Sequence, residues 1–283
     1  MKKQNLIGNL LRISVLTVIL VIMMFPLIYT ISASFKTNSE ILSRPDAVFP
    51  LDPTFNNYIE AWKSEVFDIK SMTLNSIIYT VVCVAATLLN STMGGYVYSR
   101  GNFKGKGFVF GAFSILMFFS MGSVTIYPMF DILNLINIPK SLYGLMFIRI
   151  FGVAIINIYL VKGYIDSLPR ELDEAAEIDG CNFIQIFFKI HAPLLKPIIA
   201  TIGVIAFQGS WNEYLMPMIF TMANPSQRPL IVGLVALSKS GESAANWNLV
   251  LAGTTISLIP VLVVYAIGNR YFVSGLTAGA VKG

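Results

Sequence analysis

Long apolar segments separated by short polar stretches run through nearly the whole chain. Six windows are mainly apolar over about 20 residues, the length that a helix needs to cross a hydrocarbon layer of roughly 30 Å. They cover residues 13–33, 74–98, 108–130, 142–161, 197–221 and 249–271. The pattern predicts an all-α, polytopic membrane helix bundle with six transmembrane helices and with both termini on the same side.

Polar residues interrupt the fourth and fifth of these windows. They are Arg149 in the fourth window and Gln208, Trp211, Asn212, Glu213 and Tyr214 in the fifth. A polar side chain at membrane depth is costly unless it meets a partner or a watery cavity. The donors, acceptors and aromatic plane of this group suit a sugar, which makes them candidates for a substrate pathway. Hydrogen bonding between helices is the alternative. Arg149 can also snorkel to the outer surface or pair with Glu213 or Asp131.

A strongly acidic stretch, residues 171–180, lies between these two windows. Ser167 is placed to cap a helix here, and Gly180 supplies a left-handed residue that would end it. Within the predicted helix, Leu172, Ala175 and Ala176 have i, i+3, i+4 spacing and form a narrow apolar face. Because two alanines let another backbone come close, this face is a candidate contact for another protein. A solvated connector is the alternative.

The remaining acidic residues of this stretch are interpreted as charges that keep the helix in water. They are Glu171, Asp173, Glu177 and Asp179.

Composition places the chain among integral membrane proteins. Of its 283 residues, 55% are hydrophobic and 12% are charged, against about 25% charged in a typical soluble domain. No long Pro/Gly/Ser-rich linker divides the chain. We therefore expect one transmembrane domain over residues 1–283, with a polar loop at about 166–192 and a C-terminal tail at about 273–283.

Lysine and arginine concentrate in the loops that share one side of the membrane. They lie before the first window, between the second and third, between the fourth and fifth, and after the sixth. The positive-inside rule therefore predicts that both termini and the acidic helix are cytoplasmic. The formal net charge of +5 follows from this scatter and does not indicate nucleic-acid binding, which needs clustered basic residues.

Candidate catalytic and metal-binding residues are sparse. Cys83 and Cys181 have no metal-binding or CxxC spacing, and the single histidine, His191, has no acid or base partner nearby in the sequence. We interpret His191 as a capping or solvated residue. We expect no catalytic residue, metal site or cofactor in this chain.

The acidic stretch and the segment after it resemble the Glu-Ala-Ala signature of ABC importer permeases. The signature positions are matched by Glu174, Ala175, Ala176, Gly180 and Ile190, and Ala192-Pro193 stands where that family usually has Leu-Pro. The length, the six windows, the Trp-Asn-Glu-Tyr cluster at 211–214 and the ending at 275–283 also resemble the maltose-type half of a carbohydrate permease pair. The likeness therefore covers the whole chain.

This resemblance implies a type I ABC importer permease in the bacterial cytoplasmic (inner) membrane. In that family the Glu-Ala-Ala helix is a coupling helix that docks on a cytoplasmic ATPase, and the C-terminal tail reaches into the ATPase dimer. Carried over, the ATPase-docking residues are Leu172, Glu174, Ala175, Ala176, Gly180, Gly279 and Lys282.

The resemblance also implies the partners of the chain. They are a second homologous permease subunit, two cytoplasmic ATPase subunits, an extracytoplasmic sugar-binding protein and membrane lipid, with no nucleic acid. ATP and magnesium are expected on the ATPase subunits, because this sequence contains no GxxxxGK(S/T) motif.

Three alternatives stay open from the sequence. A homodimer of permeases is possible in place of a heterodimer. A secondary transporter or channel that works without ATP would account for six spans and for Arg149 and Glu213 inside them. An intramembrane enzyme is disfavoured, since the sequence offers no His/Asp/Glu or serine-based catalytic pair. The sequence does not name the sugar.

Overall fold

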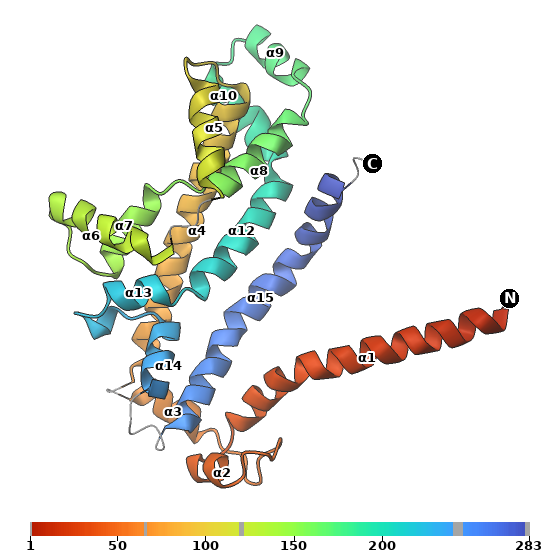
Figure 1. The fold of residues 1–283 in the computed structure, drawn as a ribbon, viewed down its shortest axis with the longest axis vertical. Coiled ribbons are helices and arrows are strands. Elements are labelled where there is room, and N and C mark those ends of the chain that lie inside the picture. Colours follow the sequence, from red (N-terminus) through yellow and green to blue (C-terminus); the bar gives the residue numbers. More distant parts are fainter. Residues whose placement is uncertain (1, 65–66, 119–121, 240–245, 281–283) are drawn as a thin grey trace. The chain divides into compact units, whose positions relative to one another are not determined.

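The computed structural model describes residues 2–64, 67–118, 122–239 and 246–280 of the chain, and every regular element among them is a helix (Figure 1). The helices are α1 (Lys2–Ala33), α2 (Asn38–Ser43), α3 (Asn56–Lys63), α4 (Ile69–Arg100), α5 (Lys106–Leu116), η1 (Gly122–Thr125), α6 (Ile126–Leu135), α7 (Leu142–Ile150), α8 (Ile155–Asp166), α9 (Glu171–Ile178), α10 (Phe183–Ile186), η2 (Phe187–His191), α11 (Ala192–Leu194), α12 (Lys196–Trp211), α13 (Leu215–Phe220), η3 (Pro225–Gln227), α14 (Leu230–Lys239) and α15 (Trp247–Ala280). The prediction of an all-α, polytopic membrane bundle is confirmed.

Four helical stretches among the described residues are long and apolar enough to cross a membrane. They are Gly8–Ala33, Ile69–Arg100, Leu142–Asp166 and Trp247–Gly268, and a bent pair of helices, Phe183–Leu194 with Lys196–Trp211, makes a fifth if it is counted as one span. They correspond to five of the six predicted windows. By length and composition, the described residues therefore do not reach the predicted count of six.

The third window, residues 108–130, was predicted as one helix, and this prediction is wrong. α5 ends at Leu116, and the described chain resumes with η1 and α6. Gly122 has a φ of +48°, outside the right-handed helical region. Pro128 lies in the first turn of α6, where its missing N–H costs no hydrogen bond. A hydropathy average over the window detects neither the positive φ of Gly122 nor the position of Pro128.

The fourth window contains a break that another helix satisfies, and a second break lies at Leu195, just before the fifth window. Between α7 and α8, the carbonyls of Ile150 and Gly152 accept hydrogen bonds from the Asn90 amide of α4, both at 2.9 Å. The helices before and after Leu195 are bent by 77°. Broken helices persist at membrane depth only where their backbone groups find such partners.

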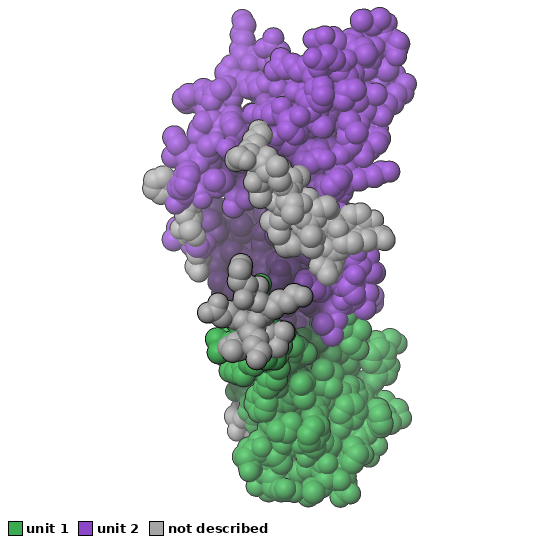
Figure 2. Space-filling model, turned by 90° about the vertical axis from the view of Figure 1, so that its right-hand side faces the viewer, with its two compact units in different colours: residues 1–70, 232–259 green, residues 71–231, 260–283 purple. Residues whose placement is uncertain are grey.

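The chain divides into two compact units, which Figure 2 colours separately. Unit 1 contains residues 1–70 and 232–259, and unit 2 contains residues 71–231 and 260–283. The expectation of a single domain over residues 1–283 stays a prediction.

Unit 1 is organised around the buried side chain of Asn57. Its amide donates to the carbonyls of Ser34 at 2.7 Å and Lys36 at 2.8 Å, and its own oxygen accepts from Asn248 at 3.0 Å. α3 is thereby fixed to the turn after α1 and to the start of α15. The apolar length of α1 is exposed from Gly8 to Ile28, as expected for a helix that lipid or another chain covers.

Unit 2 has two clusters of buried side chains. One joins α4, α8, α9 and the segment from α10 to α12, and includes Tyr96, Val161, Ala176 and Leu195. The other includes Tyr79, Leu133, Leu145 and Phe220 of α4, α6, α7 and α13. These two clusters lie next to the two groups of candidate functional residues.

Close packing of α4 against α8 depends on glycine. A Cβ atom at Gly95 would lie 2.5 Å from Cγ1 of Val161, and one at Gly94 would lie 3.0 Å from Cδ1 of Ile158. The distance at Gly95 leaves room for hydrogen alone, and at Gly94 the Ile158 side chain would have to shift, so the two helix backbones approach closely here.

Candidate functional site

The acidic stretch forms helix α9, and a Schellman motif ends it. Gly180 has a φ of +79°, as predicted. The N–H of Cys181 donates to the carbonyl of Ala176 at 2.9 Å, and the N–H of Gly180 donates to Glu177 at 3.0 Å. Ser167 does not cap the helix, contrary to prediction, because its hydroxyl donates to the carbonyl of Tyr164 at 2.6 Å.

The predicted apolar face of α9 is divided between solvent and core. The Leu172 side chain is 39% exposed, and Glu174 and Ala175 are exposed as well. Ala176 is only 5% exposed and packs into the buried cluster of unit 2. Leu172 and Ala175 therefore lie on the outer surface of α9 together with Ile178, which is 87% exposed. Glu174 is exposed but also borders a cavity between α9 and the end of α4, and Ala176 holds the helix against the protein.

Asp173 attaches the opposite side of α9 to two other elements. Its Oδ2 accepts from Nε of Arg100, at the end of α4, at 2.8 Å, and its Oδ1 lies 2.5 Å from Nε2 of His191, at the end of η2. Nη2 of Arg100 also donates to the carbonyls of Ile165 and Leu168, at 3.1 and 2.8 Å. The interpretation of Asp173 as a solubilising charge is therefore wrong.

His191 is fully buried, so the expectation of a capping or solvated role is also wrong. Its ring lies 4.9 Å from the Tyr96 ring, centroid to centroid. Its acidic partner is 18 residues away in sequence and is brought close because the chain turns at Gly180 and continues through α10 and the π-helix η2.

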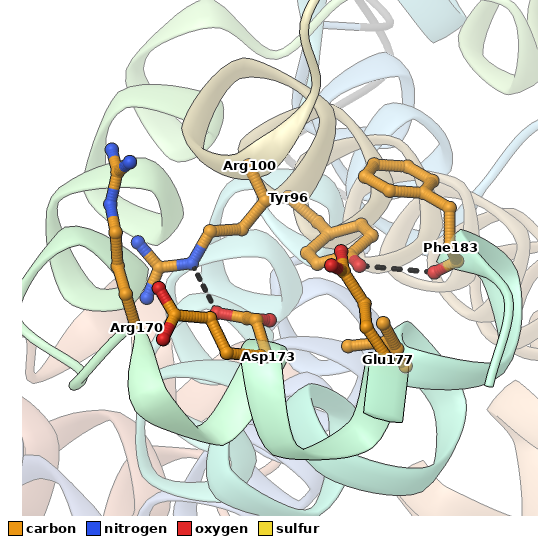
Figure 3. Close-up of a pocket in the computed structure, with 8 residues that line it drawn as sticks. Tyr96, Arg100, Arg170, Asp173, Glu177 and Phe183 are labelled. Carbon is orange, nitrogen blue, oxygen red and sulfur yellow. Dashed lines mark hydrogen bonds and ion pairs between the residues drawn. The ribbon is translucent and has the colours of Figure 1, made fainter. Parts of the chain in front are cut away.

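A cavity of about 240 Å³ lies between α9, α10 and the end of α4. Figure 3 shows Arg100 reaching Asp173 on one side of it, and the Tyr96 hydroxyl donating to the Phe183 carbonyl on the other, at 3.0 Å. Glu174 and Glu177 also line this cavity. α9 is thus anchored on the side that faces α4 and α10, and the described residues leave its outer surface uncovered.

The two C-terminal docking candidates are less informative. Gly279 falls in the last turn of α15, and Lys282 lies outside the described residues. Their docking role stays a prediction.

The second group of candidates centres on the break between α12 and α13. Glu213 lies in this break and pairs with Nη2 of Arg149 from α7. Its other oxygen accepts from the hydroxyl of Tyr79, in α4, at 2.6 Å. Pairing of Arg149 with Glu213, one of the alternatives from the sequence, is confirmed.

A cavity of about 380 Å³ opens beside this ion pair. Its lining combines the pair with hydroxyl, thiol, amide and small apolar groups: Cys83, Thr87, Arg149, Asn157, Ala206, Gly209, Ser210 and Glu213. Such a lining can hydrogen-bond polar groups without presenting an unbalanced charge.

The other predicted pathway residues are placed differently. Gln208 and Asn212 are exposed, and Tyr214 is half-buried. Trp211 is buried, and its ring stacks on Phe207 with centroids 5.7 Å apart. The aromatic plane that the sequence assigned to a sugar is therefore covered by the chain itself.

Sequence reasoning missed Tyr79, Arg100, Asp173 and His191 as members of these sites. Tyr79 carried a usable signal, because it is a polar residue within an apolar window. The other three form one buried polar cluster whose members come from three segments, and spacing along the chain gives no indication of it.

Comparison with known proteins places the whole chain among transport proteins. The family model described as "Binding-protein-dependent transport system inner membrane component" matches residues 5–277. The galactooligosaccharides transport system permease protein GanQ of Bacillus subtilis is 33% identical over 284 residues, which cover 100% of this chain and 99% of that protein. The sulfoquinovosyl glycerol transport system permease protein SmoH of Agrobacterium fabrum is 31% identical, covering 98% and 95%.

A solved structure supports the same assignment. The chain matches a subunit of a bacterial ABC transporter involved in the import of the acidic polysaccharide alginate, with a TM-score of 0.80 and 25% sequence identity. The match covers 95% of this chain and 98% of that subunit.

Proposed function

The chain belongs to the family of binding-protein-dependent transport system inner membrane components, and from this premise we propose that it is one transmembrane subunit of an ATP-driven importer of sugars or oligosaccharides. It forms half of the translocation pathway and carries out no chemistry itself. The observation that carries the proposal is α9, an acidic helix anchored on its inner side and open on its outer side.

The outer surface of α9 suits docking on another protein. Ala175 adds almost no bulk, Leu172 offers a half-exposed apolar side chain, and Glu174 adds a charge. An anchored helix moves as a rigid element with whatever holds it, so closure of an ATPase dimer moves the attached spans. Gly180 completes the docking element by ending the helix sharply.

Sugar as the transported class is supported by the relatives and by the cavity beside Glu213. The names of two relatives specify galactooligosaccharides and sulfoquinovosyl glycerol. The hydroxyl and amide groups of Thr87, Ser210 and Asn157 line that cavity, and hydroxyl-rich ligands need such donors and acceptors. Arg149 and Glu213 balance each other's charge there. The exposed Gln208 and Asn212 and the half-buried Tyr214 continue the polar stretch.

The proposed importer includes four further protein subunits. A second, related permease chain completes the pathway, two ATPase subunits on the cytoplasmic side bind ATP and magnesium, and an extracytoplasmic binding protein delivers the sugar. Both termini and α9 face the cytoplasm, consistent with the distribution of lysine and arginine. Gly279 and Lys282 provide a second contact with the ATPases.

The alternative is a transporter or channel that works without ATP. The two readings differ in one measurable respect: uptake into proteoliposomes that contain the permease pair and ATPase subunits requires internal ATP only in an importer of this kind. Galacto-oligosaccharide and the matching binding protein serve as the probe.

The same preparation tests α9. We expect the ATPase subunits to co-purify with the wild-type chain and to be lost with Glu174→Lys, while Asp179→Asn, a change of an exposed acid at the end of α9, retains them. Co-purification with Glu174→Lys and unchanged ATP-dependent uptake would contradict the docking role.

A further inference from the structure

Three separate elements meet at the carboxylate of Asp173. α9 supplies the carboxylate, the end of α4 supplies Arg100, and the end of η2 supplies His191. η2 continues through α11 into α12. Each carboxylate oxygen therefore holds a different transmembrane segment, and no other acid of α9 makes a side-chain contact of this kind among the described residues.

The cluster is buried and balanced in charge. Arg100 and Asp173 are both largely buried, and His191 is fully buried. Nδ1 of His191 has no hydrogen-bond partner among the described residues. A neutral ring that donates from Nε2 to Asp173 leaves only an acceptor unsatisfied, whereas a charged ring would leave a buried N–H and a net positive charge. The geometry therefore assigns one cation, one anion and a neutral donor.

We propose that Asp173 is the positioning residue through which this chain passes movement of the docked α9 to α4 and α12. The inference rests on the proposed function, because it presupposes an ATPase that moves α9. Apolar packing at Ala176 also holds α9, but such packing is non-directional. Hydrogen bonds fix distance and angle, so the contacts of Asp173 with Arg100 and with His191 hold α9 rigidly to α4 and to the segment that leads into α12.

The contact of Asp173 with Arg100 and its contact with His191 have different consequences. Arg100 also holds the carbonyls of Ile165 and Leu168, so the first contact fixes α9 and the α8–α9 connection to α4. His191 joins α9 to the bent segment that enters α12, which carries Ala206, Gly209 and Ser210 of the cavity wall. Movement of α9 thereby reaches the cavity from two sides.

A cysteine placed in the cavity reports this transmission without knowledge of the sugar. Asn157→Cys, in a chain with Cys83→Ser and Cys181→Ser, is assembled with its partners and treated with a charged methanethiosulfonate reagent. With Asp173 intact, Mg-ATP and vanadate are expected to change the labelling rate by about fivefold or more, as for a typical coupling between sites.

Asp173→Asn and His191→Leu are expected to abolish this change while the ATPase still binds and hydrolyses ATP. His191→Gln, which keeps a side-chain donor, is expected to restore it. Asp179→Asn removes an exposed acid from the same helix and is expected to leave the change intact.

The outcomes separate the inference from the proposed function. If the unsubstituted chain does not bind an ATPase, the proposed function fails. If it does, and both variants respond to nucleotide like the control, the positioning role is refuted. Loss of ATPase binding in both variants also refutes it, because the cluster would then serve docking or folding. If Asp173→Asn alone fails to assemble, the nucleotide-dependent change in the labelling rate of His191→Leu decides whether the positioning role holds.

Discussion

Removing either partner of the Arg149–Glu213 ion pair is expected to have unequal effects on stability. Glu213→Gln leaves the guanidinium without a counter-charge, and Nε of Arg149 already lacks a hydrogen-bond partner among the described residues. Arg149→Gln leaves a carboxylate that still accepts from the Tyr79 hydroxyl. Glu213→Gln should therefore be the more destabilising of the two.

The exposure of the two side chains sets the magnitude. Arg149 is 38% and Glu213 is 22% exposed, between a fully buried pair, whose disruption costs about 3–5 kcal/mol, and a surface pair, worth about 0–1 kcal/mol. We expect a loss of about 2 kcal/mol for Glu213→Gln and about 1 kcal/mol for Arg149→Gln. The double variant should regain part of the loss, because it buries no unpaired charge.

Thermal unfolding in detergent, followed by tryptophan fluorescence, measures these differences. A loss of 2 kcal/mol corresponds to a drop of about 4–8 °C in Tm for a chain of this size. Asn157→Ala, in the same cavity, is the control and should change stability by less than about 0.5 kcal/mol. A Tm that is unchanged in Glu213→Gln, or lower in Arg149→Gln than in Glu213→Gln, would show that loss of the Glu213 charge is not the more destabilising change.

Three further substitutions test other parts of the fold. Gly180→Ala places a side chain in a left-handed conformation at a cost of about 1 kcal/mol. The affinity for the ATPase, measured by titration, should therefore fall about fivefold. The control Gly163→Ala, which has open space in α8, should leave this affinity unchanged. A Cβ at Gly95 would lie 2.5 Å from a methyl carbon of α8, so Gly95→Leu should lower Tm by separating α4 from α8, and Gly111→Ala, with open space, should have no such effect. Asn57→Leu leaves two buried carbonyls without a donor, at about 1–3 kcal/mol each, and limited proteolysis between α1 and α3 should become faster.

Apolar windows predicted the helices that span without interruption. α1, α4 and α15 contain the first, second and sixth windows, since each is a continuous apolar run. Pro26 and Pro260 lie inside α1 and α15 without ending them. The prediction of one helix in the third window failed, because α5 ends at Leu116 and Gly122 has a positive φ, and mean hydropathy is insensitive to backbone conformation. Hydropathy therefore locates membrane segments better than it locates helix ends.

The candidate sites were predicted where their chemistry is local in sequence. Gly180 was identified because the end of a helix depends on a few consecutive residues. The pairing of Arg149 with Glu213 was one of several alternatives, and only the fold selects it. Asp173 and His191 were misread, because the turn at Gly180 and the π-helix η2 bring them together across 18 residues, and this arrangement leaves no periodic signal.

The docking of α9 on an ATPase subunit is tested by the affinity of the purified ATPase subunit for the permease, measured with wild type and with Ala175→Trp. A large ring on the outer surface of α9 blocks close approach of another backbone, while Phe108→Trp, at an exposed site on α5, does not. Ala175→Trp is expected to weaken ATPase binding at least about tenfold, as loss of a central interface contact does, and Phe108→Trp is expected to leave it unchanged. Equal affinity of the ATPase for all three proteins would contradict the docking of α9.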